Sequence, residues 1–412
     1  MAKPQIKNMT LDELYARVEE TGKATPAVTR GIIAKEDFSE YNDKYCRLVC
    51  KLPCKNNVHF PLKTEQVDIL IIQSHMPFKD KWKKGSQIEY THKRQFEELL
   101  PKGTNVELIN MVKCPTDAFR KKGKLTYTLT ATDMKGCAPY MMEEIRRINP
   151  KVIVSTTTDV TKALGFNKMS NTNNRGEVHI SEEFGIPVVI TLHVRLLNMI
   201  RQNSSGAFWG DEYTSVVRRD LRKALDISNN ELHIPDLRDT VNTARSDQII
   251  VCESIEDVRY WTDVLLNLSP TSITSWDLET TSLDPWSSDA RILTSQTGHR
   301  REDGKVQAIV IPLWHKDNDF YDPEEAFNIH KEYLLRECTK VGHNIMFDIC
   351  FLAVTTGVRL AGESLCTLLA LHSLNSGIKG CYGLKAAVWD YLPDSGFGGY
   401  EELLEVDHEP NS

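Results

Sequence analysis

Short apolar runs alternate with helical segments along the first half of the chain. The runs lie at 67–72, 106–112, 152–155 and 186–191, and each has the length of a buried strand. Between two of them, residues 134–148 have the apolar spacing of an amphipathic helix. Alternation of this kind is typical of a mostly parallel sheet that is covered by helices on both faces. The pattern therefore predicts a three-layer α/β domain.

A second α/β segment follows residues 229–246, a polar stretch without periodicity that contains Pro235. We interpret this stretch as a linker. Beyond it, the pattern predicts helices at 255–266 and around 332–338, and strands at 248–252, 273–278 and 306–313. The last of these strands is expected to pair with the strand at 273–278.

The start of the chain is expected to form a short peripheral helix. Residues 10–13 are a capping-box pattern opened by Thr10, and the apolar spacing ends near Gly22. Together, the segments predict four regions: a leader at 1–40, a first domain at 41–228, a linker at 229–246 and a second domain at 247–412.

Composition fits a globular protein without a membrane anchor. The 412 residues are 41% hydrophobic and 26% charged, which is enough for two cored domains. No apolar run has the length of a membrane span and the N-terminus has no signal-peptide core, so we expect a cytoplasmic protein. The net charge of −7 argues against a protein that only coats nucleic acid.

Asp277 and Glu279, at the end of the predicted strand 273–278, are the clearest candidates for chemistry. Alternation along a strand sends both side chains to the same face, so both carboxylates can reach one ion. Hard cations such as Mg²⁺ and Mn²⁺ prefer oxygen ligands of this kind. The alternative is a solvated strand end. A third carboxylate, Asp348, follows downstream at a predicted junction of strand and helix. Three carboxylates can bracket two metal ions, which is an arrangement used in phosphodiester hydrolysis.

The order and spacing of these residues resemble the DEDD 3'-5' exonucleases, and in particular the proofreading domain of family A DNA polymerases. Residues 277–280 match the first motif of that family, and Asn344-x3-Asp348 matches the second. Residues 382–392 resemble the helix that precedes the third motif. The resemblance implies a ribonuclease H-like α/β domain. It also implies catalytic roles for Asp277, Glu279, Asp348 and Asn344, the three acids holding two Mg²⁺ or Mn²⁺ ions.

Two departures from that family change the expectation. The last metal ligand of the family is an Asp that follows a Tyr by four positions, and no such pair occurs between Tyr382 and Ser412. The downstream Asp-Thr position of the family reads Cys366-Thr367. We therefore expect a truncated exonuclease domain. A downstream polymerase segment would supply the missing helix, and hydrolysis by this chain alone would be weak.

The cysteines of the first domain are closely spaced. Cys46, Cys50 and Cys54 form a C-x3-C-x3-C run, and Cys114 and Cys137 follow. In a chain without a secretory signal, such a group favours a metal or iron-sulfur site over disulfides. Four thiolates suit either Zn²⁺ or a [4Fe–4S] cluster, and the spacing leaves both open.

A second resemblance, to the iron-sulfur uracil-DNA glycosylases, covers the first domain. It rests on residues 110–115, on Cys137, on residues 148–154 and on residues 191–193. The resemblance implies a glycosylase-like fold. It also implies a [4Fe–4S] cluster held by Cys114, Cys137 and two of Cys46, Cys50 and Cys54.

The catalytic motifs of those glycosylases are altered in this chain. Residues 73–77 lack the carboxylate and the glycines of the first motif, and His193 is followed by Val194-Arg195 in place of Pro-Ser. We expect a glycosylase-like fold retained for DNA binding or for docking to the exonuclease domain, with base excision as an alternative. His193 is then either a nucleic-acid contact or an ordinary structural histidine.

Basic residues interleaved with aromatic residues at 79–94, and a second basic cluster at 113–124, could grip a phosphate backbone. The alternative for each cluster is a solvated loop. The expected nucleic-acid contacts are Lys81, Trp82, Lys83, Lys84, Arg94, Lys121, Lys122 and His193.

Both resemblances predict the N-terminal fragment of a phage-type DNA polymerase, in which a glycosylase-like domain precedes a 3'-5' proofreading exonuclease. Its substrate would be DNA and its location the cytoplasm, which is that of the bacterial host if the protein is phage-encoded. The alternatives are a non-catalytic DNA-binding or scaffolding module of a replication complex, and a uracil-DNA glycosylase of base excision repair.

Overall fold

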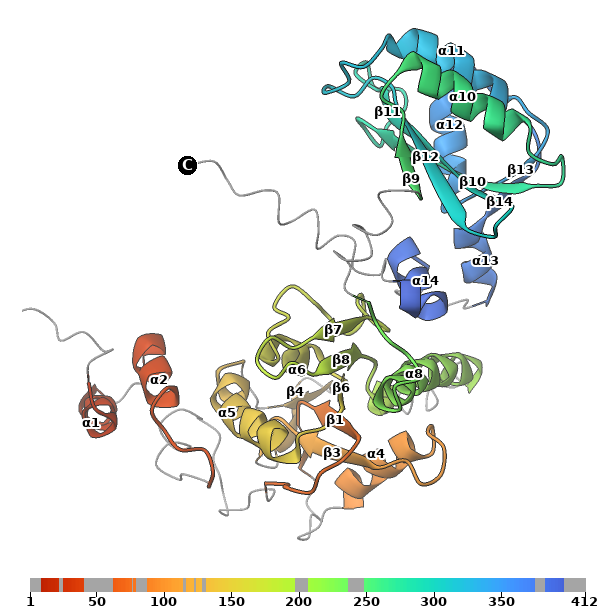
Figure 1. Ribbon diagram of the computed structural model, residues 1–412. Coiled ribbons are helices and arrows are strands. Elements are labelled where there is room, and N and C mark those ends of the chain that lie inside the picture. Colours follow the sequence, from red (N-terminus) through yellow and green to blue (C-terminus); the bar gives the residue numbers. More distant parts are fainter. Residues whose placement is uncertain are drawn as a thin grey trace, which may run out of the picture. The chain divides into compact units, whose positions relative to one another are not determined.

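The computed structural model describes residues 9–21, 25–40, 62–75, 77–78, 87–113, 116–121, 124–127, 131–196, 207–235, 248–374 and 382–395. The chain divides into two compact units: unit 1 is residues 1–233 with 378–380, and unit 2 is residues 234–377 with 381–412. Each unit is an α/β structure with a sheet and packed helices (Figure 1).

The large sheet of unit 1 has the strand order β3-β1-β6-β8-β7. Neighbouring strands are parallel except β7, which is antiparallel to β8. This arrangement confirms the mostly parallel sheet that the apolar runs predict. The strands are β1 (Ile69–Gln73), β3 (Val106–Asn110), β6 (Val152–Ser155), β7 (Val178–Ile180) and β8 (Pro187–Ile190).

Helices pack on both faces of this sheet. Leu70 and Ile72 of β1 and Ile153 of β6 are buried with residues of α5 (Ala131–Ile148) and α6 (Thr158–Ala163). The alternate positions point to the opposite face, where α4 (Gln87–Glu97) and α8 (Ala207–Ser228) contact the sheet. Unit 1 therefore has three layers.

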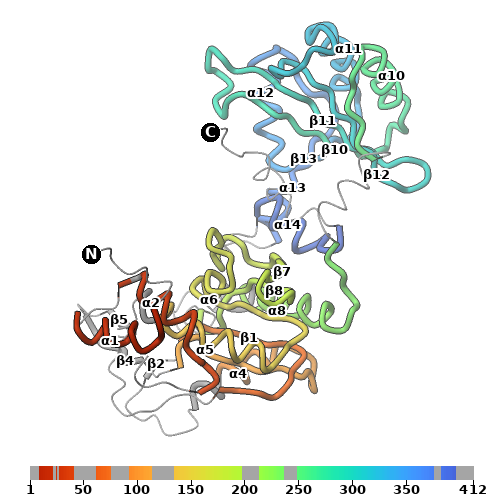
Figure 2. Tube along the Cα trace, turned by 60° about the vertical axis from the view of Figure 1, so that its left-hand side comes forward, coloured from red at the N-terminus to blue at the C-terminus, as the bar shows by residue number. Residues whose placement is uncertain are grey.

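The first two helices of unit 1 pack together beside α5 (Figure 2). In α1 (Leu11–Thr21), Glu13 accepts from the N–H of Thr10, and the Thr10 hydroxyl accepts from the N–H of Glu13, which confirms the capping box. The sequence pattern did not predict α2 (Pro26–Ile33), which begins with Thr25 as its N-cap. Leu14, Val28 and Tyr140 of α5 share one small core.

Unit 1 also contains a small sheet, part of which is formed by the basic cluster at 113–124. The sequence pattern predicts no strand there. The small sheet has the order β2-β4-β5, with β2 (Pro77–Phe78), β4 (Thr116–Lys121) and β5 (Lys124–Tyr127). Within the part of the chain that the structure describes, every helix is too short or too polar to span a bilayer.

The sheet of unit 2 has the order β14-β13-β10-β11-β12-β9. Strand β10 is parallel to β13 and antiparallel to β11, which is antiparallel to β12. The predicted pairing of 306–313 with 273–278 is therefore wrong, because β11 lies between them. The strands are β9 (Ile249–Val251), β10 (Ile273–Thr280), β11 (Ile292–Arg300), β12 (Val306–Pro312), β13 (Thr339–Gly342) and β14 (Ser364–Cys366).

The helices of unit 2 are α10 (Ile255–Leu266), α11 (Pro323–Leu334), α12 (Ile345–Thr356), α13 (Thr367–Leu374) and α14 (Leu384–Tyr391), followed by the short turn η2 (Pro393–Ser395). The helix expected around 332–338 is wrong in position. Helix α11 begins after Asp322, whose carboxylate caps the N–H of Glu324, and Pro323 occupies its first turn.

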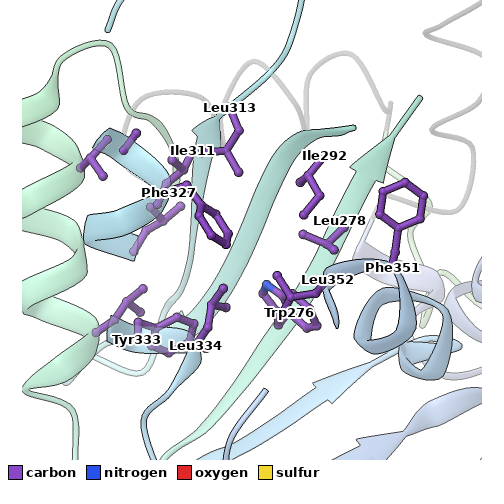
Figure 3. Packing of buried hydrophobic residues seen from close by; sticks show 14 of the residues in the cluster. Trp276, Leu278, Ile292, Ile311, Leu313, Phe327, Tyr333, Leu334, Phe351 and Leu352 are labelled. Carbon is purple, nitrogen blue, oxygen red and sulfur yellow. The ribbon is translucent and has the colours of Figure 1, made fainter. Parts of the chain in front are cut away.

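One apolar core joins the sheet of unit 2 to its helices. Trp276 and Leu278 of β10 pack with Leu352 of α12, and the same cluster contains Phe327 and Tyr333 of α11 (Figure 3). Each large side chain buried in this way stabilises the fold by about 1.5–3 kcal/mol. The core fixes which face of β10 points inward, and so which residues of β10 point away from it.

Gly342, at the end of β13, allows α12 to begin close to β10. A Cβ at this position would lie 2.8 Å from the Trp276 carbonyl oxygen and 2.9 Å from Ile345 Cβ. Backbone cannot yield at small cost, so we expect Gly342→Ala to lower the free energy of unfolding by about 2–3 kcal/mol in urea titrations. Gly383→Ala is the matched control, because a Cβ there meets nothing within 4 Å. An equal effect of both substitutions would contradict the close approach.

Candidate active site

Strand β10 places two carboxylates on the face opposite its core residues. Trp276 and Leu278 are buried, whereas Asp277 and Glu279 alternate with them and are exposed. The register between β10 and β11 shifts after Glu279, where a bulge ends the regular ladder. The predicted alternation is therefore observed, and both acids share one face of one strand.

Helix α12 brings the third carboxylate to the same strand. Asn344 adopts the left-handed conformation, with φ 63°, and the helix starts at the next residue. Asp348 lies in its first turn and is only 3% exposed. The pairing of β13 with β10 stops at Ser275, and Asp348 Oδ1 accepts the backbone N–H of Leu278 at 3.1 Å. Asp348 is thus bonded to the backbone between the two strand acids.

Burial and the neighbouring negative charges raise the pKa values of Asp348 and Asp277. Burial raises the pKa of Asp348 to about 7, the charges of Asp277 and Glu279 add to this effect, and the Leu278 N–H opposes it. Although Asp277 is exposed as a residue, partial desolvation of its carboxyl group and the charge of Glu279 raise its pKa to about 6. The three carboxyl groups therefore lie within electrostatic reach of one another, and the site is short of positive charge.

The donor set fits a hard divalent cation. Carboxylate oxygens are the ligands that Mg²⁺ and Mn²⁺ prefer, and a cation there would relieve the repulsion that raises both pKa values. Among the described residues, no three His, Cys, Asp or Glu side chains already converge as metal ligands. Binding would then require rotation of side chains, which the exposed Asp277 and Glu279 permit.

Cys366 ends β14 close to the start of α12, in the position where the sequence departs from the family pattern. Burial raises the pKa of its thiol, but the nearby backbone N–H groups of Leu369 and Asn344, with those of Ile345 and Leu368, lower the pKa below its ordinary value. The neighbouring Thr367 hydroxyl bonds His343 Nδ1 at 3.0 Å. This bond joins the start of α13 to the residue before Asn344.

The loop that follows β10 presents two apolar side chains, which the sequence analysis did not identify. Leu283 is 88% exposed and Trp286 is 74% exposed, the highest values among the large hydrophobic residues described. The loop is nevertheless well bonded: the Trp286 N–H donates to Asp284, and the Thr281 N–H donates to the Arg291 carbonyl. The sequence signal that could have indicated this loop is Trp286, an aromatic residue soon after the acidic residues Asp277 and Glu279.

The other predicted site residues lie in unit 1 or outside the described residues. Cys137 lies in α5, where it is buried with Val112 and Met134. Arg94 is exposed on α4 and pairs with Glu98. Lys121 belongs to β4, but only its backbone is described. The residues outside the described ranges are Cys46, Cys50, Cys54, Lys81, Trp82, Lys83, Lys84, Cys114 and Lys122.

His193 belongs to a buried polar cluster at the carboxyl ends of β1 and β3. Its Nε2 bonds Gln73 Oε1 at 2.5 Å, and its Nδ1 accepts the backbone N–H of Arg195 at 2.9 Å. His92 Nδ1 bonds the same Gln73 oxygen at 3.1 Å. Burial, followed by the charges of His92 and His75, lowers the pKa of His193 to about 3. His193 is therefore neutral, and both ring nitrogens are engaged.

Comparison with known families agrees with the site in unit 2. A family model described as 3'-5' exonuclease matches residues 250–376, which contain Asp277, Glu279, Asn344 and Asp348. The chain thus carries a 3'-5' exonuclease domain in this region. No curated protein matches the chain.

Several solved structures of nucleases resemble part of the chain. Brucella melitensis NrnC is 20% identical, with 35% of this chain and 61% of that chain covered and a TM-score of 0.24. Escherichia coli RNase D, an exoribonuclease involved in structured RNA processing, is 16% identical, with 36% and 33% covered and a TM-score of 0.26. The EXD2 exonuclease domain soaked in Mn and GMP is 16% identical, with 35% and 68% covered and a TM-score of 0.21. This chain spans less than two thirds of NrnC and about a third of RNase D.

Proposed function

We propose that the chain is the N-terminal part of a DNA polymerase of the phage type. In this proposal, unit 2 is a metal-dependent 3'-5' proofreading exonuclease that acts on DNA in the cytoplasm. The observation that carries the proposal is the gathering of Asp277, Glu279 and Asp348 around one end of β10, within the region that matches the 3'-5' exonuclease family.

In this function the three carboxylates hold Mg²⁺ or Mn²⁺. Divalent ions in such sites activate a water and stabilise the leaving oxygen of the phosphodiester. Asp277 and Glu279 supply exposed oxygens from the strand, and Asp348 is held in place by the Leu278 N–H. Asn344, in its left-handed conformation, sets the start of the helix that carries Asp348.

The loop after β10 suits an unpaired 3' end. Leu283 and Trp286 expose apolar surface on a hydrogen-bonded loop that begins shortly after Glu279. Aromatic side chains stack on bases without reading their sequence, and each such contact contributes about 1–3 kcal/mol. We therefore assign single-stranded or frayed 3' ends as the substrate.

A downstream polymerase segment is the proposed partner of unit 2. The sequence between Tyr382 and Ser412 holds no Tyr-x3-Asp pair of the resembled family, and in this proposal the polymerase segment supplies that pair. Helices α13 and α14 also expose large apolar side chains, including Leu369, Leu374 and Leu384. Such a surface is typical of a protein interface.

Unit 1 is proposed to bind DNA with a glycosylase-like fold and a [4Fe–4S] cluster held by four of the five cysteines, with Zn²⁺ as the alternative. Iron and sulfide analysis of the purified protein tests the cluster, and zinc or free thiols in its place would contradict it.

Base excision is disfavoured, because both ring nitrogens of His193 are hydrogen-bonded within the protein. Uracil-containing DNA left intact by the cluster-bearing protein would agree with this interpretation.

The test of the exonuclease is release of nucleotides from 3'-labelled single-stranded DNA by the full chain with Mn²⁺ or Mg²⁺. We expect slow, metal-dependent release that is lost in Asp277→Ala, because the strand loses a metal ligand. Asp263→Ala removes an exposed acid of α10 and is the matched control. Release that survives in Asp277→Ala would refute the assignment. Release from RNA but not from DNA would refute the polymerase context and leave the nuclease intact.

A further inference from the structure

A chain of three polar groups crosses the core beneath the acidic residues of unit 2. The Trp276 indole Nε1 lies 3.1 Å from Ser295 Oγ, and Ser295 Oγ lies 3.0 Å from His330 Nε2. Trp276 belongs to β10, Ser295 to β11 and His330 to α11. All three are at most 2% exposed.

The direction of the first hydrogen bond follows from its chemistry. An indole N–H can only donate, so Ser295 Oγ accepts from Trp276. Toward His330, the Ser295 hydroxyl either donates its proton to Nε2 or accepts the Nε2 proton on its second lone pair, and both arrangements link His330 to Trp276 through Ser295. Burial, and then the charge of Lys340, lower the pKa of His330 to about 4, so this histidine stays neutral near pH 7.

Placing a histidine here has a cost that apolar packing would avoid. His330 is completely buried, and its Nδ1 has no hydrogen-bond partner among the described residues. An unsatisfied buried donor or acceptor destabilises a fold by about 1–3 kcal/mol. A phenylalanine would fill similar space without that cost, so the position of His330 calls for another explanation.

Trp276 is constrained on two sides. Its indole is bonded through Ser295 to α11, and its carbonyl oxygen lies against Gly342, where α12 approaches β10. The next residue along the strand is Asp277, and α12 carries Asp348. Rotation of Trp276 would therefore change the orientation of Asp277 relative to Asp348.

We propose that His330 is a positioning residue of the acidic site: through Ser295 it fixes the Trp276 indole, and thereby the geometry with which Asp277 and Asp348 bind a divalent cation. This inference rests on the proposed function of unit 2. It assigns a role in metal binding to a residue of α11 that touches neither substrate nor metal.

The experiment measures Mn²⁺ binding to the full chain by electron paramagnetic resonance, together with the indole N–H signals in a ¹H–¹⁵N spectrum. We expect His330→Phe to weaken Mn²⁺ binding about tenfold, which is the effect of losing a supporting contact outside the ligands themselves. The Trp276 indole signal, assigned from its loss in Trp276→Phe, should shift. His330→Gln retains an acceptor and should restore most of the affinity.

Tyr333→Phe is the matched control, because it removes a buried hydroxyl that bonds Thr274 of the same strand and retains the hydrogen bonds that join Trp276, Ser295 and His330. It should leave Mn²⁺ affinity within about twofold, since the metal ligands keep their support. Ser295→Ala removes the hydroxyl that joins Trp276 to His330, and it provides the test if His330→Phe does not fold. Wild-type affinity in folded His330→Phe or Ser295→Ala would overturn the inference alone. A wild-type chain that binds no Mn²⁺ would overturn the proposed function and the inference with it.

Discussion

Replacing Asp348 by asparagine is expected to abolish metal-dependent nucleotide release while making the metal-free chain more stable. Asparagine keeps an oxygen that can accept the Leu278 N–H, so the turn of α12 is retained. It cannot supply the negative charge that a divalent cation needs, and we expect a loss of at least about a thousandfold in the rate of release. The rate is measured on 3'-labelled DNA beside the wild-type chain.

The same substitution is expected to stabilise the metal-free chain, because the negative charge at position 348 is unfavourable without metal. Burial and the charges of Asp277 and Glu279 raise the pKa of Asp348 to about 7, from an ordinary value of 3.8. At about 1.4 kcal/mol per pKa unit, ionisation at pH 8 costs at most about 4 kcal/mol. We expect Asp348→Asn to recover part of this at pH 8 and a smaller part at pH 5, where the carboxyl group is protonated in the folded chain and ionised only in the unfolded chain.

Urea titrations at the two pH values measure this difference, with Asp263→Asn as the control on an exposed acid of α10. Equal stability changes at pH 5 and pH 8 would show that Asp348 is not in a repulsive cluster. Retained nuclease activity in Asp348→Asn would remove it from the site. The combination of lost activity and raised stability distinguishes a strained functional residue from a structural one.

The acidic site could be predicted from sequence because its chemistry is local. Asp277 and Glu279 share a face by alternation along one strand, and Asp348 lies in the first turn of a helix after a strand, both of which are short-range patterns. The bounds of α10 agree with the prediction for the same reason, since the apolar spacing and the Ser254 cap coincide.

Strand β11 could not be predicted, because most of its buried positions are polar. Ser295, Thr297 and His299 point into the protein where apolar residues would mark a strand. Ser295 is accommodated by Trp276 and His330, which come from distant parts of the sequence. The hydrogen bond between Thr367 and His343 is likewise a contact between separate segments, so no local pattern indicates it.

Divalent metal is expected to offset much of the pH dependence of the stability of unit 2. The pKa values of Asp277 and Asp348 are raised to about 6 and about 7 in the folded chain. A carboxyl group whose pKa is raised on folding makes its full contribution to the free energy of unfolding only below its unfolded pKa, near 3.8. That contribution is lost as the pH rises through 6 and 7. The metal-free chain should therefore become less stable between pH 5 and pH 8.

Mn²⁺ binds the ionised carboxylates, so its stabilising effect should grow over the same range in which the metal-free chain weakens. At a concentration about 100 times its dissociation constant, a ligand adds about 2.7 kcal/mol of stability. We expect a gain of this size at pH 8 and almost none at pH 5, measured by thermal unfolding with and without Mn²⁺.

The rate of nucleotide release should fall about tenfold from pH 7 to pH 6 and more steeply below, since both acids must lose their protons to bind metal. In Asp348→Asn the Mn²⁺ effect at pH 8 should be much smaller, because a ligand is lost, and what remains should follow the ionisation of Asp277. A Mn²⁺ effect that is equal at pH 5 and pH 8 in the wild-type chain would place the metal away from these carboxylates.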